Sequence, residues 1–259
     1  MKITLTILAI LAFIVILVTA TWGFVSLNIF PNTALGLYNK SFFENLLVEI
    51  HGTIFDIFVV AVILFWFEKR QETKNRINEA NETLDYLKNY QGDDASYKFY
   101  GMLKKLLALG ENKIKIPDGK LNKLKIDSIN LDSSNLIAVD FSDSNISNCS
   151  FVRCNAEASR FFNVQINHTK LQYVNLQRTK FNNARLKGMD FRTCDIRFAD
   201  FNGALLQSAD FRGVDCEGVN FKNANLRSAN FKGAKNLTMK MLQLAKDTNY
   251  VKLSDDIVE

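Results

Sequence analysis

A five-residue period runs through the second half of the chain and sets the strongest limit on its fold. From residue 126 to residue 231 every fifth position holds an apolar side chain, which makes 22 consecutive repeats in one register. This period fits neither the 3.6-residue turn of a helix nor the two-residue alternation of a strand. It predicts a solenoid, in which each unit buries its apolar residue against its neighbours. The repeat centres are Ile126, Leu131, Leu136, Phe141, Ile146, Phe151, Ala156, Phe161, Ile166, Leu171, Leu176, Phe181, Leu186, Phe191, Ile196, Phe201, Leu206, Phe211, Cys216, Phe221, Leu226 and Phe231.

The residues around each centre are also regular. The residue two places earlier is usually small, and Asp or Asn usually stands directly before the centre, as in Ala-Asp-Phe-Asn-Gly at 199–203 and Ala-Asn-Leu-Arg-Ser at 224–228. This pattern closely resembles the pentapeptide-repeat family, whose consensus is Ala-(Asp/Asn)-Leu-x-x. The resemblance covers roughly 116–253. It implies a right-handed quadrilateral parallel β-helix, an all-β solenoid with four repeats in each coil.

Phenylalanine recurs at every tenth residue from 141 to 231, with Leu171 as the single exception. With four sides to a coil, these rings fall on two opposite walls and the protein's own side chains fill the interior. Ligands then have to use the outer walls or an end. In the first half of the series larger residues replace the small one, and we expect those coils to be less regular than 184–231. The larger residues are Leu124, Ile129, Val139 and Val164.

Four regions follow from these patterns. Residues 1–67 are predicted to form a two-helix transmembrane hairpin, 68–110 a helical connector, 111–235 the β-helix, and 236–259 a C-terminal capping helix with a tail. The cap is implied by the family resemblance, because an amphipathic stretch follows the last repeat and would cover the open edge of the solenoid. In family members this end often forms the dimer contact.

Two apolar stretches near the N-terminus are long enough to be membrane helices. Ile3–Phe30 holds 28 residues without a charge, and about 20 suffice to span a bilayer. A cleaved signal peptide is the rival interpretation, but the run is longer than the apolar core of such a signal and continues past the cleavage point expected at Ala20. The second stretch, Ile50–Phe67, ends abruptly at a cluster of charges.

The second stretch contains acidic residues that form a polar face. Only 11 residues separate Asp56 from the end of the stretch, roughly 16 Å of helix, so we place Asp56 within the membrane or at its edge. Glu49 lies seven residues earlier on the same helix face, and His51 points away from it. An ionisable group at this depth favours an oligomer contact, a pore lining or a proton site. The favoured alternative is an interfacial aspartate that reaches water.

Basic residues predict the orientation of the hairpin. Lys69, Arg70, Lys74 and Arg76 follow the second stretch, whereas the loop between the two stretches offers only Lys40. By the positive-inside rule, both termini lie in the cytoplasm and the short loop lies outside a bacterial inner membrane.

The connector carries one narrow apolar seam, formed by Ile77, Ala80, Leu84 and Leu87 at helical spacing. Packing against the next helix, expected over 96–109 and closed by a glycine, and self-association are equally open for this seam.

No pattern in the chain indicates catalysis. There are two His and four Cys, no Cys-x-x-Cys pair, no nucleophile–base arrangement and no glycine-rich phosphate loop, so we expect no enzyme activity, no metal and no cofactor. His168 is expected to face outward alone. The four cysteines occupy inward positions of the repeat, where they act as small apolar residues.

The outer walls hold the candidate partner surface. Residues 20 apart stack in adjacent coils, so Arg192, Arg212 and Lys232 form a ladder. A parallel ladder of Asp190 and Asp210 lies on the same wall and compensates it. Outward apolar residues would mark a partner site if they were contiguous; the chief ones are Phe162, Tyr173 and Phe198.

These patterns favour a membrane-anchored interaction protein that presents its β-helix to a cytoplasmic protein partner, with self-association through the hairpin, the connector or the C-terminal helix. The rival is a membrane-active effector, for example in antiviral defence, whose hairpin perturbs the bilayer. A third alternative is the acidic DNA mimic that binds gyrase, known in this family. Residues 121–235 hold 16 Lys/Arg against 11 Asp/Glu, which is the wrong sign for such a mimic. Nucleic-acid binding is not expected either, because acids alternate with the bases.

Overall fold

A computed structural model of the chain describes residues 2–28 and 39–254. These residues fall into two compact units, one ending at Asn75 and one beginning at Arg76. The first holds helix α1 (Lys2–Asn28) and the greater part of helix α2 (Lys40–Asn89); the second holds the end of α2, helix α3 (Ala95–Ala108), the strands and helix α4 (Met239–Gln243). The segment 29–38, which includes most of the expected loop, lies outside the described residues.

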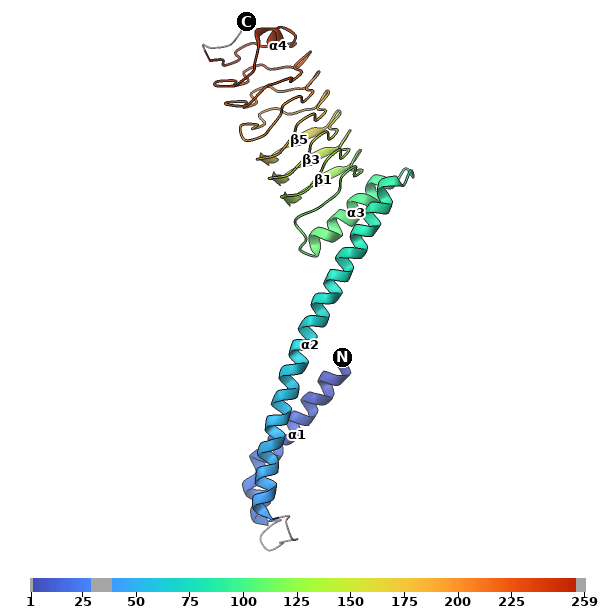
Figure 1. Cartoon of the computed structure of the whole chain (residues 1–259), viewed down its shortest axis with the longest axis vertical. Helices are drawn as coiled ribbons and strands as arrows, with labels where there is room; N and C mark the ends of the chain where they lie inside the picture. Colours follow the sequence, from blue (N-terminus) through green and yellow to red (C-terminus); the bar gives the residue numbers. More distant parts are fainter. Residues whose placement is uncertain (1, 29–38, 255–259) are drawn as a thin grey trace. The chain divides into compact units, whose positions relative to one another are not determined.

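In the first unit α1 lies beside the early part of α2 (Figure 1). The Thr19 hydroxyl and Nε2 of His51 are 3.3 Å apart, and the Trp22 indole donates to the Glu44 carboxylate over 3.3 Å. Both helices are long and apolar enough to cross a membrane. Helix α2 begins ten residues before the expected Ile50 and continues without a break through the charged stretch. The predicted helical continuation of the second apolar stretch is therefore confirmed.

The end of α2 and α3 pack onto the first coil of the solenoid. Ala80, Leu84 and Leu87 are buried in one continuous core with Phe99 of α3. The Phe99 ring lies so close to the backbone of Gly119 that a Cβ there would stand 2.8 Å from it. The apolar seam of the connector is thus occupied within the chain, which decides between the two alternatives left open for it. These helices also cover the N-terminal edge of the solenoid.

The solenoid consists of 20-residue coils stacked in parallel. Strands 20 residues apart pair in register, for example Ile126 with Ile146 and Leu131 with Phe151. Isolated bridges keep this register as far as Asn230 and Lys252. One sheet has the order β1 (Lys125–Asp127), β3 (Asn145–Ser147), β5 (Gln165–Asn167), and the other β2 (Asn130–Asp132), β4 (Ser150–Val152), β6 (Lys170–Gln172).

Two columns of stacked phenylalanine rings fill the interior, as the ten-residue spacing predicts. One column runs from Phe141 to Phe221, and its neighbouring rings have centroids 4.7 to 5.7 Å apart. The second runs from Phe191 to Phe231 and meets the first edge-on. All four cysteines are buried, as expected. Such dispersion-rich packing in every coil is the main stabilising term of the solenoid.

The corners of the coils explain the remaining letters of the repeat. The residue two places after most centres adopts a φ near +55°, which Asn, Asp, Ser and Gly tolerate best. The Asp or Asn before the centre accepts a hydrogen bond from the backbone N–H two residues on, as Asp200 does from Asn202 over 3.1 Å. These side chains therefore hold the corners.

The C-terminal region closes the other end. Thr238 caps α4 by accepting the N–H of Met241, and Leu242 is buried against the last coil. After this short helix, Asp247 and Lys252 pair with Asn225 and Asn230 and so continue the coil register. The tail is thus part of the solenoid beyond the expected boundary at 235.

One expectation about regularity is wrong. The coils with large residues at the small position keep their coil-to-coil pairing, and Val139 and Val164 are completely buried there. Among the described residues, the pairing fails between 170 and 190 and between 195 and 215, within and beside the stretch expected to be most regular. The backbone register tolerates a larger inward side chain; the corner conformation described below is what interrupts it.

Candidate partner-binding site

The acidic face of the hairpin points away from α1. His51 lies against α1, while Glu49 and Asp56 are exposed on the other side of α2. Neither carboxylate has a side-chain partner among the described residues. The spacing argument for their shared face agrees with this placement, and their role stays a prediction.

The basic residues after the second apolar stretch all lie exposed along α2. They are Lys69, Arg70, Lys74 and Arg76. The guanidinium of Arg70 stands 5.2 Å from the ring centroid of Trp66, a cation–π contact one helical turn away.

The basic ladder on the outer wall is paired with the acidic one. Arg192 donates to Asp190 at 2.8 Å and approaches Asp210 at 3.5 Å, and Arg212 donates to Asp210 at 2.7 Å. The hydrogen bond from Arg192 lowers the pKa of Asp190, and Arg212 does the same for Asp210. Lys232 has no acidic partner in the described part of the chain. This ladder is therefore largely neutralised from within.

The outward apolar residues stand on different corners of the coil. Phe162, Tyr173 and Phe198 differ by 11 and 25 residues, so a 20-residue coil separates them around its perimeter. Phe198 covers Gly218 of the next coil, and the guanidinium of Arg178 lies 5.9 Å from its ring centroid. Each is thus a local surface feature of its own corner.

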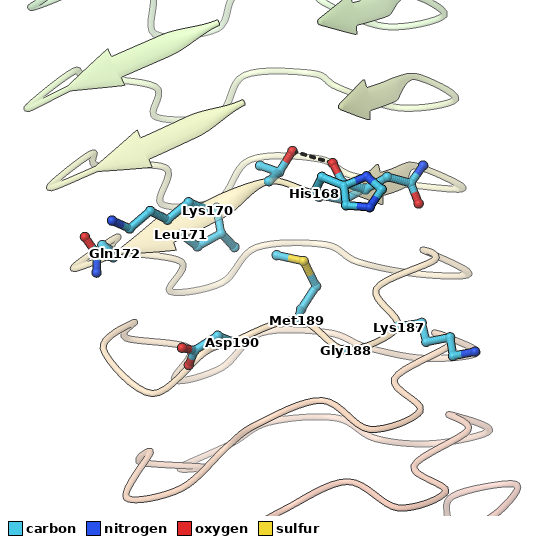
Figure 2. Close-up of a pocket in the computed structure, with 11 residues that line it drawn as sticks. His168, Lys170, Leu171, Gln172, Lys187, Gly188, Met189 and Asp190 are labelled. Carbon is cyan, nitrogen blue, oxygen red and sulfur yellow. Dashed lines mark hydrogen bonds between the residues drawn. The ribbon is translucent and has the colours of Figure 1, made fainter. Parts of the chain in front are cut away.

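A cleft of about 530 Å³ opens in the wall that carries the basic ladder (Figure 2). It lies between the edge of one coil, 168–172, and the edge of the next, 187–190. Leu171 and Met189 lie between the two coils, with polar side chains around them (Figure 2).

The cleft exists because the two coils do not pair there. Elsewhere, a backbone N–H donates to the carbonyl 19 residues later, as Leu136 does to Asn155 over 2.7 Å and Arg153 to Gln172 over 2.8 Å. Along the edges 168–173 and 187–192, four such bonds are absent from this fully described stretch. They would join the N–H groups of His168, Leu171, Tyr173 and Asp190 to the carbonyls of Lys187, Asp190, Arg192 and Thr169. We call this stretch the open seam.

Thr193 supplies the physical reason for the gap. At every other position two after a centre between 118 and 233, all of them described, φ is positive; Thr193 alone departs from this. A β-branched residue is strongly disfavoured at positive φ. The altered corner brings the Thr193 hydroxyl to the Tyr173 N–H, at 3.1 Å, where a carbonyl would otherwise accept. Both interruptions of the ladder flank this corner.

Sequence reasoning missed the open seam, although a signal was present. Thr193 is the one β-branched residue among the positions two after a centre from 118 to 233, and Leu171 and Met189 depart from the Phe and Ala that the column otherwise favours. His168, expected to be an isolated outward residue, lines the cleft.

Comparison with known proteins identifies the repeat. A family model described as "Pentapeptide repeat region" matches residues 144–221. No match was found among curated proteins. Solved structures to which the chain is similar include the pentapeptide-repeat protein Rfr23 from the cyanobacterium Cyanothece 51142, at 19% identity over 54% of this chain and 90% of that one, with a TM-score of 0.28. QnrB1, a plasmid-mediated fluoroquinolone resistance protein, matches at 14% identity over 55% and 92%, with a TM-score of 0.26. HetL from Nostoc sp. strain PCC 7120 matches at 14% identity over 59% and 93%, with a TM-score of 0.19.

Proposed function

Because residues 144–221 are a pentapeptide-repeat region, we propose that this chain is a membrane-anchored, non-enzymatic interaction protein. Its N-terminal hairpin would sit in a bacterial inner membrane, and its β-helix, right-handed as in the family, would present its outer walls to a protein partner in the cytoplasm. The observation that carries the proposal is the combination, in one chain, of two membrane-length apolar helices with a solenoid whose interior is already full.

The exposed apolar surface of the hairpin supports the membrane anchor. Phe13, Phe24 and Phe55 are 65%, 73% and 66% exposed. A soluble protein rarely leaves so many large apolar side chains in water, whereas lipid would cover them. The cluster of basic residues after the second helix supports a cytoplasmic C-terminal side.

The solenoid supports binding rather than catalysis. The stacked rings leave no interior cavity of ligand size among the coils, and the described residues contain no group of three or more His, Cys, Asp or Glu side chains close enough to hold a metal. Helices cover both ends. A partner would therefore meet the outer walls.

Self-association has fewer routes than the sequence allowed. The connector seam packs inside its own chain, which leaves the hairpin and the C-terminal region. Leu244 and Tyr250 are 50% and 75% exposed at that end. We keep a homo-oligomer as part of the proposal through these two surfaces.

Membrane fractionation with topology reporters tests the anchor and its orientation. We expect the full chain in the membrane fraction, a fluorescent reporter fused after residue 259 to be active, and alkaline phosphatase at the same point to be inactive. A chain that begins at residue 68 is the control and should be released into the soluble fraction. Membrane association of that control, or an active phosphatase fusion, would contradict the proposal.

A second candidate is a membrane-active effector. Exposure of Glu49 and Asp56 on the side of α2 that α1 leaves free favours it, because unpartnered carboxylates at membrane depth are costly and usually functional. Membrane potential in cells that express the full chain, with and without phage challenge, distinguishes the candidates. An effector should depolarise the membrane and lose this effect in Asp56→Leu but keep it in the matched control Thr53→Leu. An anchor should do neither.

A further inference from the structure

The open seam leaves both kinds of backbone group without a partner. One edge presents the N–H groups of His168 and Leu171 and the carbonyl of Thr169, and the other presents the carbonyl and N–H of Asp190 and the carbonyl of Lys187. Unpaired backbone groups away from bulk water are unfavourable, so water or a ligand has to meet them. Donors and acceptors occur on both edges. A bare anion satisfies only donors and a cation only acceptors, whereas an extended peptide offers both in alternation.

The charges around the seam select the side chains of such a peptide. Lys170 and Lys187 are exposed at the cleft, and neither forms an ion pair within the described residues. The carboxylate of Asp190 is already taken, because its two oxygens accept from Nε and a terminal nitrogen of Arg192 at 3.0 and 2.8 Å. The uncompensated charge at the cleft is therefore positive, which favours acidic side chains on the ligand.

The apolar floor gives the peptide its second face. Leu171 and Met189 lie between the coils within the cleft (Figure 2). Alternate side chains of an extended peptide point to opposite sides, so apolar residues can contact this floor while acidic residues meet the lysines.

We propose that the open seam binds an extended acidic peptide segment of the protein partner, by backbone hydrogen bonds to the unpaired edges and by acidic side chains on Lys170 and Lys187. The inference deepens the proposed function, since it presupposes a protein partner for the outer walls. Thr193 is the residue that keeps the seam open, because it holds its corner out of the left-handed conformation.

Binding of a synthetic peptide to the full-length protein in detergent micelles tests this inference. The probe is a fluorescein-labelled nine-residue peptide of alternating glutamate and valine, and the matched control peptide has lysine in place of glutamate. Fluorescence anisotropy should detect the acidic peptide and not the basic one. Hydrogen exchange should show new protection at Leu171 and Asp190, with the other walls unchanged.

Three variants locate the site. The double variant Lys170→Glu/Lys187→Glu should weaken binding at least tenfold, while Lys222→Glu, an equal charge change on another wall, should leave it within twofold. Thr193→Asn permits positive φ at the corner, so it should restore pairing across the seam, raise exchange protection in the free protein and abolish binding.

Some outcomes would overturn the inference. Equal weakening by Lys222→Glu, a protection footprint outside 168–173 and 187–192, or no binding of the acidic peptide would each do so. So would inorganic polyphosphate that binds as tightly as the peptide, because that result marks a nonspecific anion site. Failure of these tests with a correct membrane topology removes the seam and leaves the proposed function standing. A wrong topology in the reporter assay removes the proposed function independently.

Discussion

Truncation of one ring in the phenylalanine column should destabilise the solenoid locally and strongly. Phe201 is completely buried, stacks on Phe181 and Phe221 at 4.9 and 5.7 Å, and meets Phe191 and Phe211 edge-on. A buried Phe→Ala change costs about 3–5 kcal/mol, because the lost contacts are added to the cost of the cavity. In a solenoid each coil contacts only its neighbours, so the loss should concentrate on the coils that hold these rings.

Hydrogen exchange measured by mass spectrometry resolves this effect along the chain. At about 1.4 kcal/mol per tenfold change, Phe201→Ala should lower protection of the amides between 181 and 221 by about 10² to 10³. The matched control is Leu205→Ala, an apolar residue four places on that points outward, which should change protection less than about threefold. Equal losses in both variants would refute the stacked column as the source of stability. A uniform loss that extends to the first coil would refute the nearest-neighbour argument.

Three further predictions concern the corners, the cysteines and the charge ladder. Gly218 has φ +64° and a Cβ there would meet the ring of Phe198, so Gly218→Val should lower the melting temperature by several degrees, whereas Gly213→Asn, at an open corner that Asn tolerates, should change it little. Burial raises the pKa of the Cys216 thiol to about 12, so a maleimide at pH 7.5 should label it only after denaturation. The hydrogen bond from Arg212 holds the pKa of Asp210 below its ordinary value; this stabilisation is present above the unfolded pKa near 3.9 and is lost as pH falls through the folded value. Melting temperatures at pH 5 and pH 3 should therefore differ less in Arg212→Gln than in the unsubstituted protein.

The repeat made most of the solenoid predictable. A buried residue at every fifth position requires a coil that closes after a whole number of repeats, and the ten-residue spacing of Phe places the rings on two walls. The small residue and the Asp or Asn before each centre are local requirements of the corner, so they are legible one repeat at a time. Registers such as Ile126 with Ile146 follow from the period alone.

Contacts between distant elements were less predictable. The apolar seam around Leu84 fits a second chain as well as its own α3, because both offer the same kind of surface. The choice depends on Phe99, which reaches Gly119 in the first coil, and nothing in the local pattern of either residue reports that contact. The open seam was hidden for another reason. The five-residue register passes through Leu171 and Phe191 unchanged, and the break arises from the backbone angle of one corner residue.

The open seam also bears on how such a protein can hold a weak place in its core. Four missing hydrogen bonds forgo about 0.5–1.5 kcal/mol each, a loss that could unfold a small globular domain of marginal stability. A solenoid tolerates it because the pairing of Ile166 with Arg185 and of Leu176 with Asp195 on either side remains intact, and each coil contributes its own share of stability. A local departure from otherwise consistent rules is most often found where a protein binds something. The ring columns therefore do more than stabilise the fold: they allow one wall to stay unpaired without loss of register.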